Sequence, residues 1–151
     1  MNTGPRDATA AATTVLAFDF GEKRIGVAVG DLVLRIAHPL LTIDAEDNAT
    51  RFNRIGALID EWRPVLLIVG LPMHADGTEH RLSALARRFG NRLEGRFGVK
   101  VTLIDERLTS RSAESRLREA GVRADKIKAA LDAAAAREIL DSYFAGLPLA
   151  P

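Results

Sequence analysis

Short apolar runs alternate with tight turns through the first third of the chain. Residues 15–21 and 24–30 form two such runs, and a third at residues 32–43 is interrupted near Pro39. Runs of this length with short links between them are typical of neighbouring antiparallel strands. The pattern therefore predicts an initial three-stranded meander, whose first strand is apolar on both faces except at Asp19.

The apolar period changes after this meander. Asp44 and Asp47 resemble the start of a helix, and apolar residues then recur at helical spacing as far as Trp62. The chain continues with a buried strand (65–71), a helix after Thr78, a strand (99–104), a helix from Thr109 or Ser110 to about Gly121, and a helix from about Asp125 to Phe144. This order, β-β-β-α-β-α-β-α-α, predicts an α/β fold with a mixed five-stranded sheet flanked by helices. It is the order of a ribonuclease-H-like domain, with three antiparallel strands followed by βαβα units.

Length and composition indicate a single domain. The 151 residues include no cysteine, and no apolar run approaches the ~18 residues of a membrane span. We expect residues 1–14 to be a disordered tail, residues 15–145 the domain and residues 146–151 a C-terminal tail. The cysteine-free composition and the lack of a signal-like segment favour a cytoplasmic protein.

Charge is nearly balanced, so a nucleic-acid partner would need a local basic surface. The formal net charge is +1, and the basic residues are 17 Arg against 4 Lys. Guanidinium groups bind phosphate through two parallel N–H groups, although a composition rich in arginine and alanine is also typical of a GC-rich genome. The positions of the arginines on the surface would distinguish these explanations.

Three acidic positions, far apart in the sequence, stand beside apolar segments. Asp19 lies in the first strand, Asp105 and Glu106 follow the strand at residues 99–104, and Asp132 lies among alanines in the last helix. A carboxylate in apolar surroundings needs an ion pair, hydrogen bonds or a cation. Because ligands bind beyond the carboxyl ends of parallel strands, these acids are candidate members of one cluster.

Carboxylate oxygens are the ligands that Mg²⁺ and Mn²⁺ prefer. We therefore predict Asp19, Glu106 and Asp132 as metal ligands and catalytic residues, holding two ions about 3.5–4 Å apart that act on a phosphodiester. Adjacent residues of an extended chain point to opposite sides, so Asp105 and Glu106 should not both face the metal. We expect Asp105 to support the ligands without binding the metal directly. Each acid alone has an ordinary alternative, such as a strand-end carboxylate bonded to amides, or an Asp132 paired with Lys128 in solvent.

Basic residues follow the acids closely. Lys23 and Arg24 come after the first strand, and Arg107 and Arg111 come after the strand at residues 99–104. Thr109 would begin a helix whose free amide groups can bind a phosphate oxygen. We predict these five residues as nucleic-acid contacts, although a solvated helix face would have the same pattern.

Four segments resemble motifs of the YqgF or RuvX family, the pre-16S ribosomal RNA nucleases that are also described as Holliday-junction-resolvase-like proteins. The segments are residues 19–28 (Asp-Phe-Gly-Glu-Lys-Arg-Ile-Gly-Val-Ala), residues 69–78, residues 105–110 (Asp-Glu-Arg-Leu-Thr-Ser) and the helix around residues 132–135. The resemblance covers roughly residues 15–144. Its first and third motifs are specific, whereas the last is degenerate.

The resemblance implies a ribonuclease-H-like fold and a cytoplasmic bacterial nuclease that needs Mg²⁺ or Mn²⁺. Its substrate would be the 5′ end of the small-subunit rRNA precursor, with a ribosomal particle as a further partner. Asp19, Glu106 and Asp132 match the family's acidic positions, whereas Ala133 and residues 73–75 depart from its pattern. Two alternatives stay open: a resolvase of four-way DNA junctions, which needs a two-fold dimer, and a non-catalytic nucleic-acid-binding module for ribosome assembly. The sequence leaves the choice between monomer and homodimer open.

Overall fold

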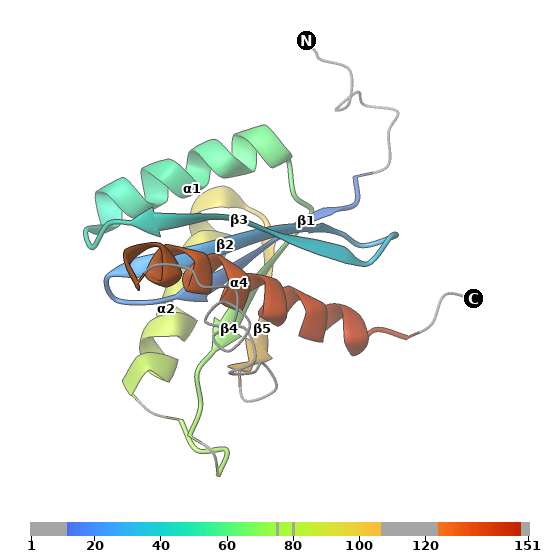
Figure 1. Ribbon diagram of the computed structural model, residues 1–151. Helices are drawn as coiled ribbons and strands as arrows, with labels where there is room; N and C mark the ends of the chain where they lie inside the picture. Colours follow the sequence, from blue (N-terminus) through green and yellow to red (C-terminus); the bar gives the residue numbers. More distant parts are fainter. Residues whose placement is uncertain (1–11, 75, 80, 107–123, 149–151) are drawn as a thin grey trace.

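A mixed sheet of five described strands forms the centre of the computed structural model, which describes residues 12–74, 76–79, 81–106 and 124–148 (Figure 1). The strands are β1 (Thr14–Phe20), β2 (Arg24–Asp31), β3 (Ile36–Asp44), β4 (Leu66–Leu71) and β5 (Lys100–Asp105). They follow the order β3-β2-β1-β4-β5, which makes β1 the central strand. β1 runs antiparallel to β2 and parallel to β4, and β4 runs parallel to β5. The predicted meander and mixed sheet are confirmed.

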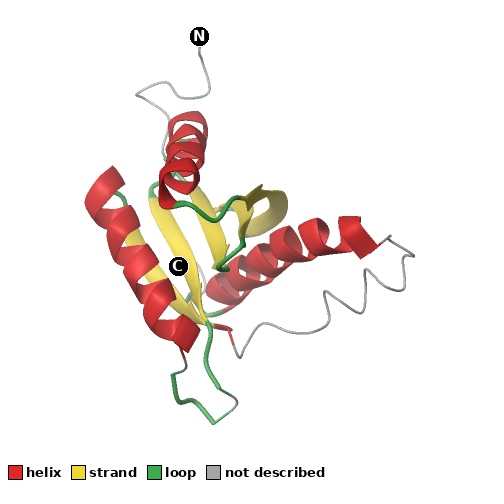
Figure 2. Cartoon of the chain, turned by 90° about the vertical axis from the view of Figure 1, so that its left-hand side faces the viewer, coloured by secondary structure: helices red, strands yellow, loops and turns green. Residues whose placement is uncertain are grey.

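Helices cover both faces of the sheet. They are α1 (Asn48–Trp62), α2 (Arg81–Phe97) and α4 (Ala124–Ala145). Figure 2 shows α4 on the opposite side of the strands from α1 and α2. Alternate residues of β1 therefore enter different cores: Leu16 and Phe18 pack with α1 and α2, while Val15 and Ala17 pack with α4. Burial on both faces explains why β1 is a continuous apolar run.

The predicted interruption at Pro39 is an irregularity inside β3 and does not end the strand. The pairing of β2 with β3 shifts register between Val27 and Ala28, and Ala28 pairs with Pro39. Proline has no N–H to donate to a ladder, so it is tolerated at bulges and on edge strands. β3 is the outermost described strand on its side of the sheet, and it meets both conditions.

The ends of α1 follow local rules. Asp47 caps the helix, with its carboxylate accepting the Thr50 N–H at 2.9 Å, whereas Asp44 is still the last residue of β3. At the other end Arg63 adopts a left-handed conformation with φ of 49°. Pro64 follows and prevents the helix from continuing. Of the two predicted start residues, only Asp47 is therefore the cap.

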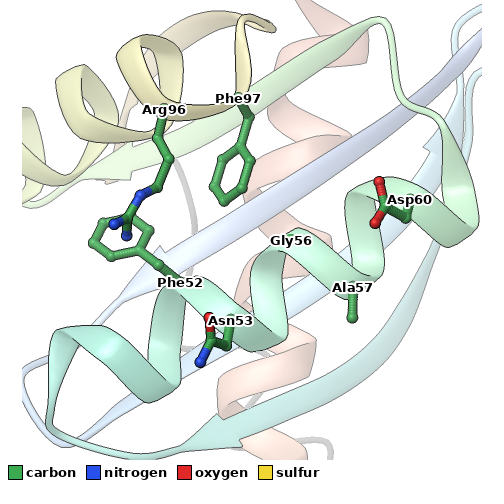
Figure 3. A pocket seen from close by; sticks show the side chains of 7 residues that line it. All are labelled: Phe52, Asn53, Gly56, Ala57, Asp60, Arg96 and Phe97. Carbon is green, nitrogen blue, oxygen red and sulfur yellow. The ribbon is translucent and has the colours of Figure 1, made fainter.

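The start of α2 differs from the prediction. Thr78 does not cap the helix, because its hydroxyl donates to the Asp76 carboxylate at 2.7 Å inside the preceding loop. The helix begins at Arg81 and lies alongside α1, where Arg96 covers the ring of Phe52 (Figure 3). The side chain of Phe97 packs close to the α1 backbone on the same side.

The last predicted helix is confirmed as α4. Its sheet-facing side chains include Ala136, Ile139, Leu140 and Phe144, all buried. The helix predicted between residues 109 and 121 lies outside the described residues. None of the described helices combines the length and apolar character needed to cross a lipid bilayer.

Candidate active site

Asp19 lies near the carboxyl end of the central strand, on the face that α4 covers. Phe18 belongs to the core under α1 and α2, so the next side chain along the strand points to the opposite face. The residue paired with Asp19 on β2 is Gly26, which has no side chain to fill the space beside it. The Asp19 carboxyl group therefore lies between the sheet and α4, where removal from water is costly.

Glu106 follows β5 and reaches the carboxyl group of Asp19. A hydrogen bond joins the two side chains, and such a bond requires a proton on one of the two carboxyl groups. Gly70 in β4 leaves space for this approach, since a Cβ there would lie 2.9 Å from both Cγ and Oε1 of Glu106. The strand between the two acids is thus open at the position where they meet.

The pKa of Asp19 is raised well above its ordinary value. Burial is the largest cause, followed by the hydrogen bond with Glu106, the charge of Glu106 and the charge of Asp132. All four effects act against ionisation of the Asp19 carboxyl group. The site therefore concentrates more acidic groups than it can keep ionised without a positive partner.

Asp132 projects from α4 and forms an ion pair with Arg24 at the start of β2. Arg24 Nε donates to Asp132 Oδ2 at 2.8 Å, and the two side chains are about a quarter exposed. The carboxylate raises the pKa of Arg24. Asp132 is thus within electrostatic reach of Asp19, but its carboxylate is bonded to a guanidinium. Within the described part of the chain, no group of three or more Asp, Glu, His or Cys side chains is placed to hold a metal ion.

The backbone of α4 comes very close to the sheet at Gly26. A Cβ at this position would overlap the carbonyl oxygen of Asp132 and lie 3.0 Å from the Ala133 nitrogen. Ala133 and Ala136 are buried on the sheet-facing side of the helix. Small residues on both surfaces therefore determine how deeply α4 carries Asp132 into the site.

The other predicted site residues have different placements. Asp105 is the last residue of β5 and is half-buried, and Lys23 is exposed in the turn between β1 and β2. Arg107, Thr109 and Arg111 lie outside the described residues. Arg24 was predicted to contact nucleic acid, and the structure places its Nε on Asp132.

Sequence reasoning missed the role of Arg51, which fixes the turn beside the acids. This side chain is only 3% exposed, and it donates to the carbonyl oxygens of Gly21, Glu22 and Ala45 at 2.5–2.7 Å. Its position four residues before Ile55, on the buried side of α1, was the available signal. A buried arginine is stable only with such partners, so the turn and α1 hold each other in place.

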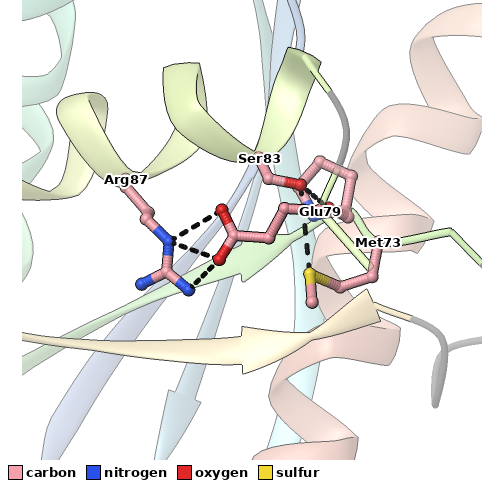
Figure 4. A network of polar contacts seen from close by, with 5 residues as sticks. Met73, Glu79, Ser83 and Arg87 are labelled. Carbon is pink, nitrogen blue, oxygen red and sulfur yellow. Dashed lines mark hydrogen bonds and ion pairs between the residues drawn. The ribbon is translucent and has the colours of Figure 1, made fainter. Parts of the chain in front are cut away.

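Ion pairs also connect the loops at this edge of the sheet. Glu22 accepts two hydrogen bonds from Arg81 at 2.7 and 3.0 Å, which links the β1–β2 turn to α2. In the loop before α2, Glu79 pairs with Arg87 at 2.6 Å, and the Ser83 hydroxyl donates to a backbone carbonyl of the same loop (Figure 4). These contacts tie the described part of the β4–α2 loop and the β1–β2 turn to α2.

Comparison with known proteins identifies the family. A family model described as "RuvX: Holliday junction resolvase" matches residues 13–146. The chain belongs to the RuvX family. A "Putative pre-16S rRNA nuclease" of Methylobacillus flagellatus is 54% identical over 143 residues, which cover 95% of this chain and 98% of the relative. A protein of the same name from Chromobacterium violaceum is 61% identical over 130 residues, which cover 85% and 95%. The predicted family is confirmed, and with it the enzyme class, a nuclease acting on phosphodiester bonds.

The fold is similar to that of a solved RuvC structure. RuvC of Thermus thermophilus, in a complex with a Holliday junction substrate, matches with a TM-score of 0.51 and 18% identity over 87% of this chain and 93% of that one. At this level of identity the similarity concerns the fold alone. It confirms the predicted ribonuclease-H-like architecture of a RuvX chain.

Asp19→Asn is expected to stabilise the metal-free protein at neutral pH. Because the folded pKa of Asp19 lies above the unfolded value of about 3.9, the folded state binds more protons between the two values, and wild-type stability falls as pH rises through that window. The fall is at most about 1.4 kcal/mol per pH unit for one group. Urea unfolding in EDTA should give the variant a larger free energy of unfolding than wild type at pH 7. The difference should become smaller as the pH is lowered toward 4. A less stable variant at pH 7 would mean that Asp19 has a structural role.

Gly26→Ala is expected to destabilise the fold and displace Asp132. The added methyl group would push α4 away from β2, and overpacking of this kind costs typically about 1–3 kcal/mol. Thermal unfolding would measure the loss. Gly95→Ala is the control, since a Cβ at Gly95 meets nothing within 4 Å. Alanine is more favourable than glycine in a helix by about 1 kcal/mol, so this variant should not lose stability. Equal melting temperatures for Gly26→Ala and wild type would contradict the close approach.

Proposed function

We propose that this RuvX chain is a divalent-cation-dependent nuclease that processes the 5′ end of pre-16S ribosomal RNA. The observation that carries the proposal is the half-buried, hydrogen-bonded pair of Asp19 and Glu106, with Asp132 in electrostatic reach, at the carboxyl edge of the parallel strands. The names of the relatives supply the substrate. Such a substrate would place the enzyme in the cytoplasm, on a ribosomal particle or its precursor.

The acidic cluster has the chemistry of a Mg²⁺ or Mn²⁺ site. Its donors are carboxylate oxygens, which these ions prefer. The raised pKa of Asp19 supports the proposal, because a cation would supply a positive charge beside Asp19 and Glu106 and would favour ionisation of Asp19. Asp19 and Glu106 would hold the cation, and Asp132 would join them by exchanging its ion pair with Arg24.

The reaction would be hydrolysis, in which a water oxygen bonds to phosphorus while the bond from phosphorus to the leaving oxygen breaks and that oxygen takes up a proton. One or two bound cations would lower the pKa of the attacking water and stabilise the leaving oxygen. The chain's own groups position these partners: α4 limits the access of bulk water to Asp19, and Arg24 holds a positive charge beside the acids. Guanidinium N–H groups in such a place can donate to a phosphate oxygen.

A second candidate is the resolution of four-way DNA junctions. It is favoured by the description of the matching family model and by the RuvC-like fold. The same acids would serve, but two symmetric cuts need two sites related by a two-fold axis. The substrate and the oligomeric state therefore separate the two candidates.

Cleavage by purified protein tests the proposal directly. The substrates are a pre-16S 5′ fragment, a four-way DNA junction and unstructured single strands, each with Mn²⁺ or with EDTA. Wild type should cut the rRNA precursor only with metal, and Asp19→Asn should lower the rate at least a hundredfold, because loss of a ligand removes cation-assisted chemistry. Glu61→Gln, an exposed residue near the far end of α1, is the matched acid-to-amide control and should cut like wild type.

The possible outcomes separate the candidates. Preference for the junction, together with a dimer in solution, would replace the first proposal with the second. Cutting on none of the substrates, or equal cutting by wild type and Asp19→Asn, would instead favour a nucleic-acid-binding module without catalysis.

Metal binding has a readout that does not depend on activity. A ligand that binds only the folded state stabilises it, by about 2.7 kcal/mol at a hundred times its Kd. Mn²⁺ should therefore raise the melting temperature of wild type and of Glu61→Gln, and should raise that of Asp19→Asn or Glu106→Gln much less. The same shift in all four proteins would place the cation elsewhere.

A further inference from the structure

Helix α2 carries an excess of positive charge that the acidic site does not use. Five arginines and one glutamate lie between Arg81 and Phe97. Arg88, Arg92 and Arg96 follow one another at four-residue spacing, so they share one side of the helix. All three are exposed, and they border hollows between α2 and α1.

Ion pairing distinguishes these three arginines from their neighbours. Arg81 pairs with Glu22 and Arg87 pairs with Glu79. Within the described residues, no ion pair joins Arg88, Arg92 or Arg96 to a carboxylate. Like charges at four-residue spacing destabilise a helix. The row is therefore unfavourable for the free protein, and an anionic ligand would offset this cost.

Two adjoining hollows lie along the row and share the ring of Phe52. The smaller, of about 140 Å³, is bordered by Phe20, Arg88 and Arg92. The larger, of about 460 Å³, is bordered by Arg96 and Phe97. Together they form what we call the α1–α2 groove, which has arginines on its rim and aromatic rings in its floor. Figure 3 shows its wider part, with the Arg96 guanidinium 4.8 Å from the centre of the Phe52 ring.

The α1–α2 groove opens at the same edge of the sheet as the acids. Phe20 directly follows Asp19, and its ring packs on Phe89 of α2 with a centroid separation of 5.1 Å. Asp19 and Phe20 therefore point to opposite faces of one strand end. A chain that passes over this end can touch the acids on one face and Arg88 and Arg92 on the other.

Asp60 limits the basic part of the groove. It borders the larger hollow together with Arg96, so its negative charge opposes a phosphate there. The smaller hollow, in contrast, has two arginines and no carboxylate among its described lining residues. Arg88 and Arg92 are therefore the two residues placed to bind phosphates, while Arg96 lies over an aromatic ring.

We propose that the α1–α2 groove binds the phosphodiester backbone of a single-stranded stretch of RNA next to the cleavage point, through Arg88 and Arg92. The proposal rests on the nuclease function proposed above and adds a substrate-binding surface outside the acidic cluster. Phe52 and Phe89 are buried in the floor of the groove, whereas Phe20 and Phe97 are half-buried at its border. A positive groove with partly exposed rings at its border is an arrangement that holds single strands, whose bases are free to stack. A paired helix presents phosphates but no open base faces, so a single strand fits the groove better.

The test measures binding without cleavage. The probe is a fluorescent single-stranded RNA of about 12 nucleotides, in EDTA, with the Asp19→Asn protein as the parent. Each lost phosphate contact should reduce the slope of log affinity against log salt by about 0.7 for a single strand. Arg88→Gln/Arg92→Gln should therefore lower the slope by about 1.4 and weaken binding roughly 25-fold at 0.1 M salt. Arg88→Lys/Arg92→Lys keeps both positive charges and should retain most of the slope. That result would show that the glutamine variant binds weakly because it lost charge and not because it lost packing.

Arg87→Gln is the control. It removes one positive charge from the same helix, one residue from Arg88, but Arg87 pairs with Glu79 outside the groove. It should bind like the parent. The proposal that the groove binds RNA would be overturned if Arg88→Gln/Arg92→Gln had the same affinity and the same salt dependence of affinity as Arg87→Gln. Equal competition by a blunt RNA duplex would overturn the single-strand preference. Failure of the nuclease proposal has a different signature, because wild type would then cut nothing with metal while the binding comparison remains valid.

Discussion

Placing an aspartate near the carboxyl end of the central strand is the constraint on which the candidate site depends. β1 is covered on both faces, and Asp19 comes directly after four fully buried residues at positions 15–18. Its carboxyl group meets Glu106 across a gap left by Gly70, and α4 closes over it because Gly26 lacks a side chain. A larger residue at either glycine would separate groups that the chemistry requires to be close. The two glycines therefore belong to the site as much as the acids do.

Arginines balance this concentration of acid, each with a different partner. Arg24 neutralises Asp132, and Arg51 donates to carbonyl oxygens of the turn and of Ala45 and lies over the ring of Phe20. Arg81 fixes the same turn from α2 through Glu22. The turn after Asp19 is thus held from two helices, which keeps the strand end rigid. Rigid support of this kind is what a site needs to hold acids in place before the substrate arrives.

Much of the fold could be predicted from the sequence because the signals are local. Strand and helix segments differ in apolar period, and the short links in the first third of the chain allow little besides a meander. The cap at Asp47 and the break at Arg63 and Pro64 also depend only on nearby residues. The prediction for Thr78 is wrong because α2 begins only at Arg81, and the Thr78 hydroxyl donates to Asp76 within the loop. Local competition between side chains is harder to predict than periodicity.

Contacts between residues far apart in the sequence could not be predicted from the sequence. The Arg24–Asp132 pair joins residues 108 positions apart, and Lys128, four residues from Asp132, was the partner suggested by spacing. The role of Arg51 likewise depends on carbonyl groups about 30 residues away. Resemblance to family motifs could name the acids, but not the guanidinium that one of them binds. Pairs of this type require the sheet order to be known first.

Acidic and basic groups lie on opposite faces of the sheet at the end of β1. Acids lie on the α4 face at Asp19, where they repel phosphate unless a cation is present, while Arg88 and Arg92 lie on the α1–α2 face beyond Phe20. Grouping both on one face would let arginines neutralise the acids, as Arg24 already does for Asp132. The sheet edge keeps Arg88 and Arg92 away from that role. Binding charge and catalytic charge can then coexist in a chain whose net charge is only +1.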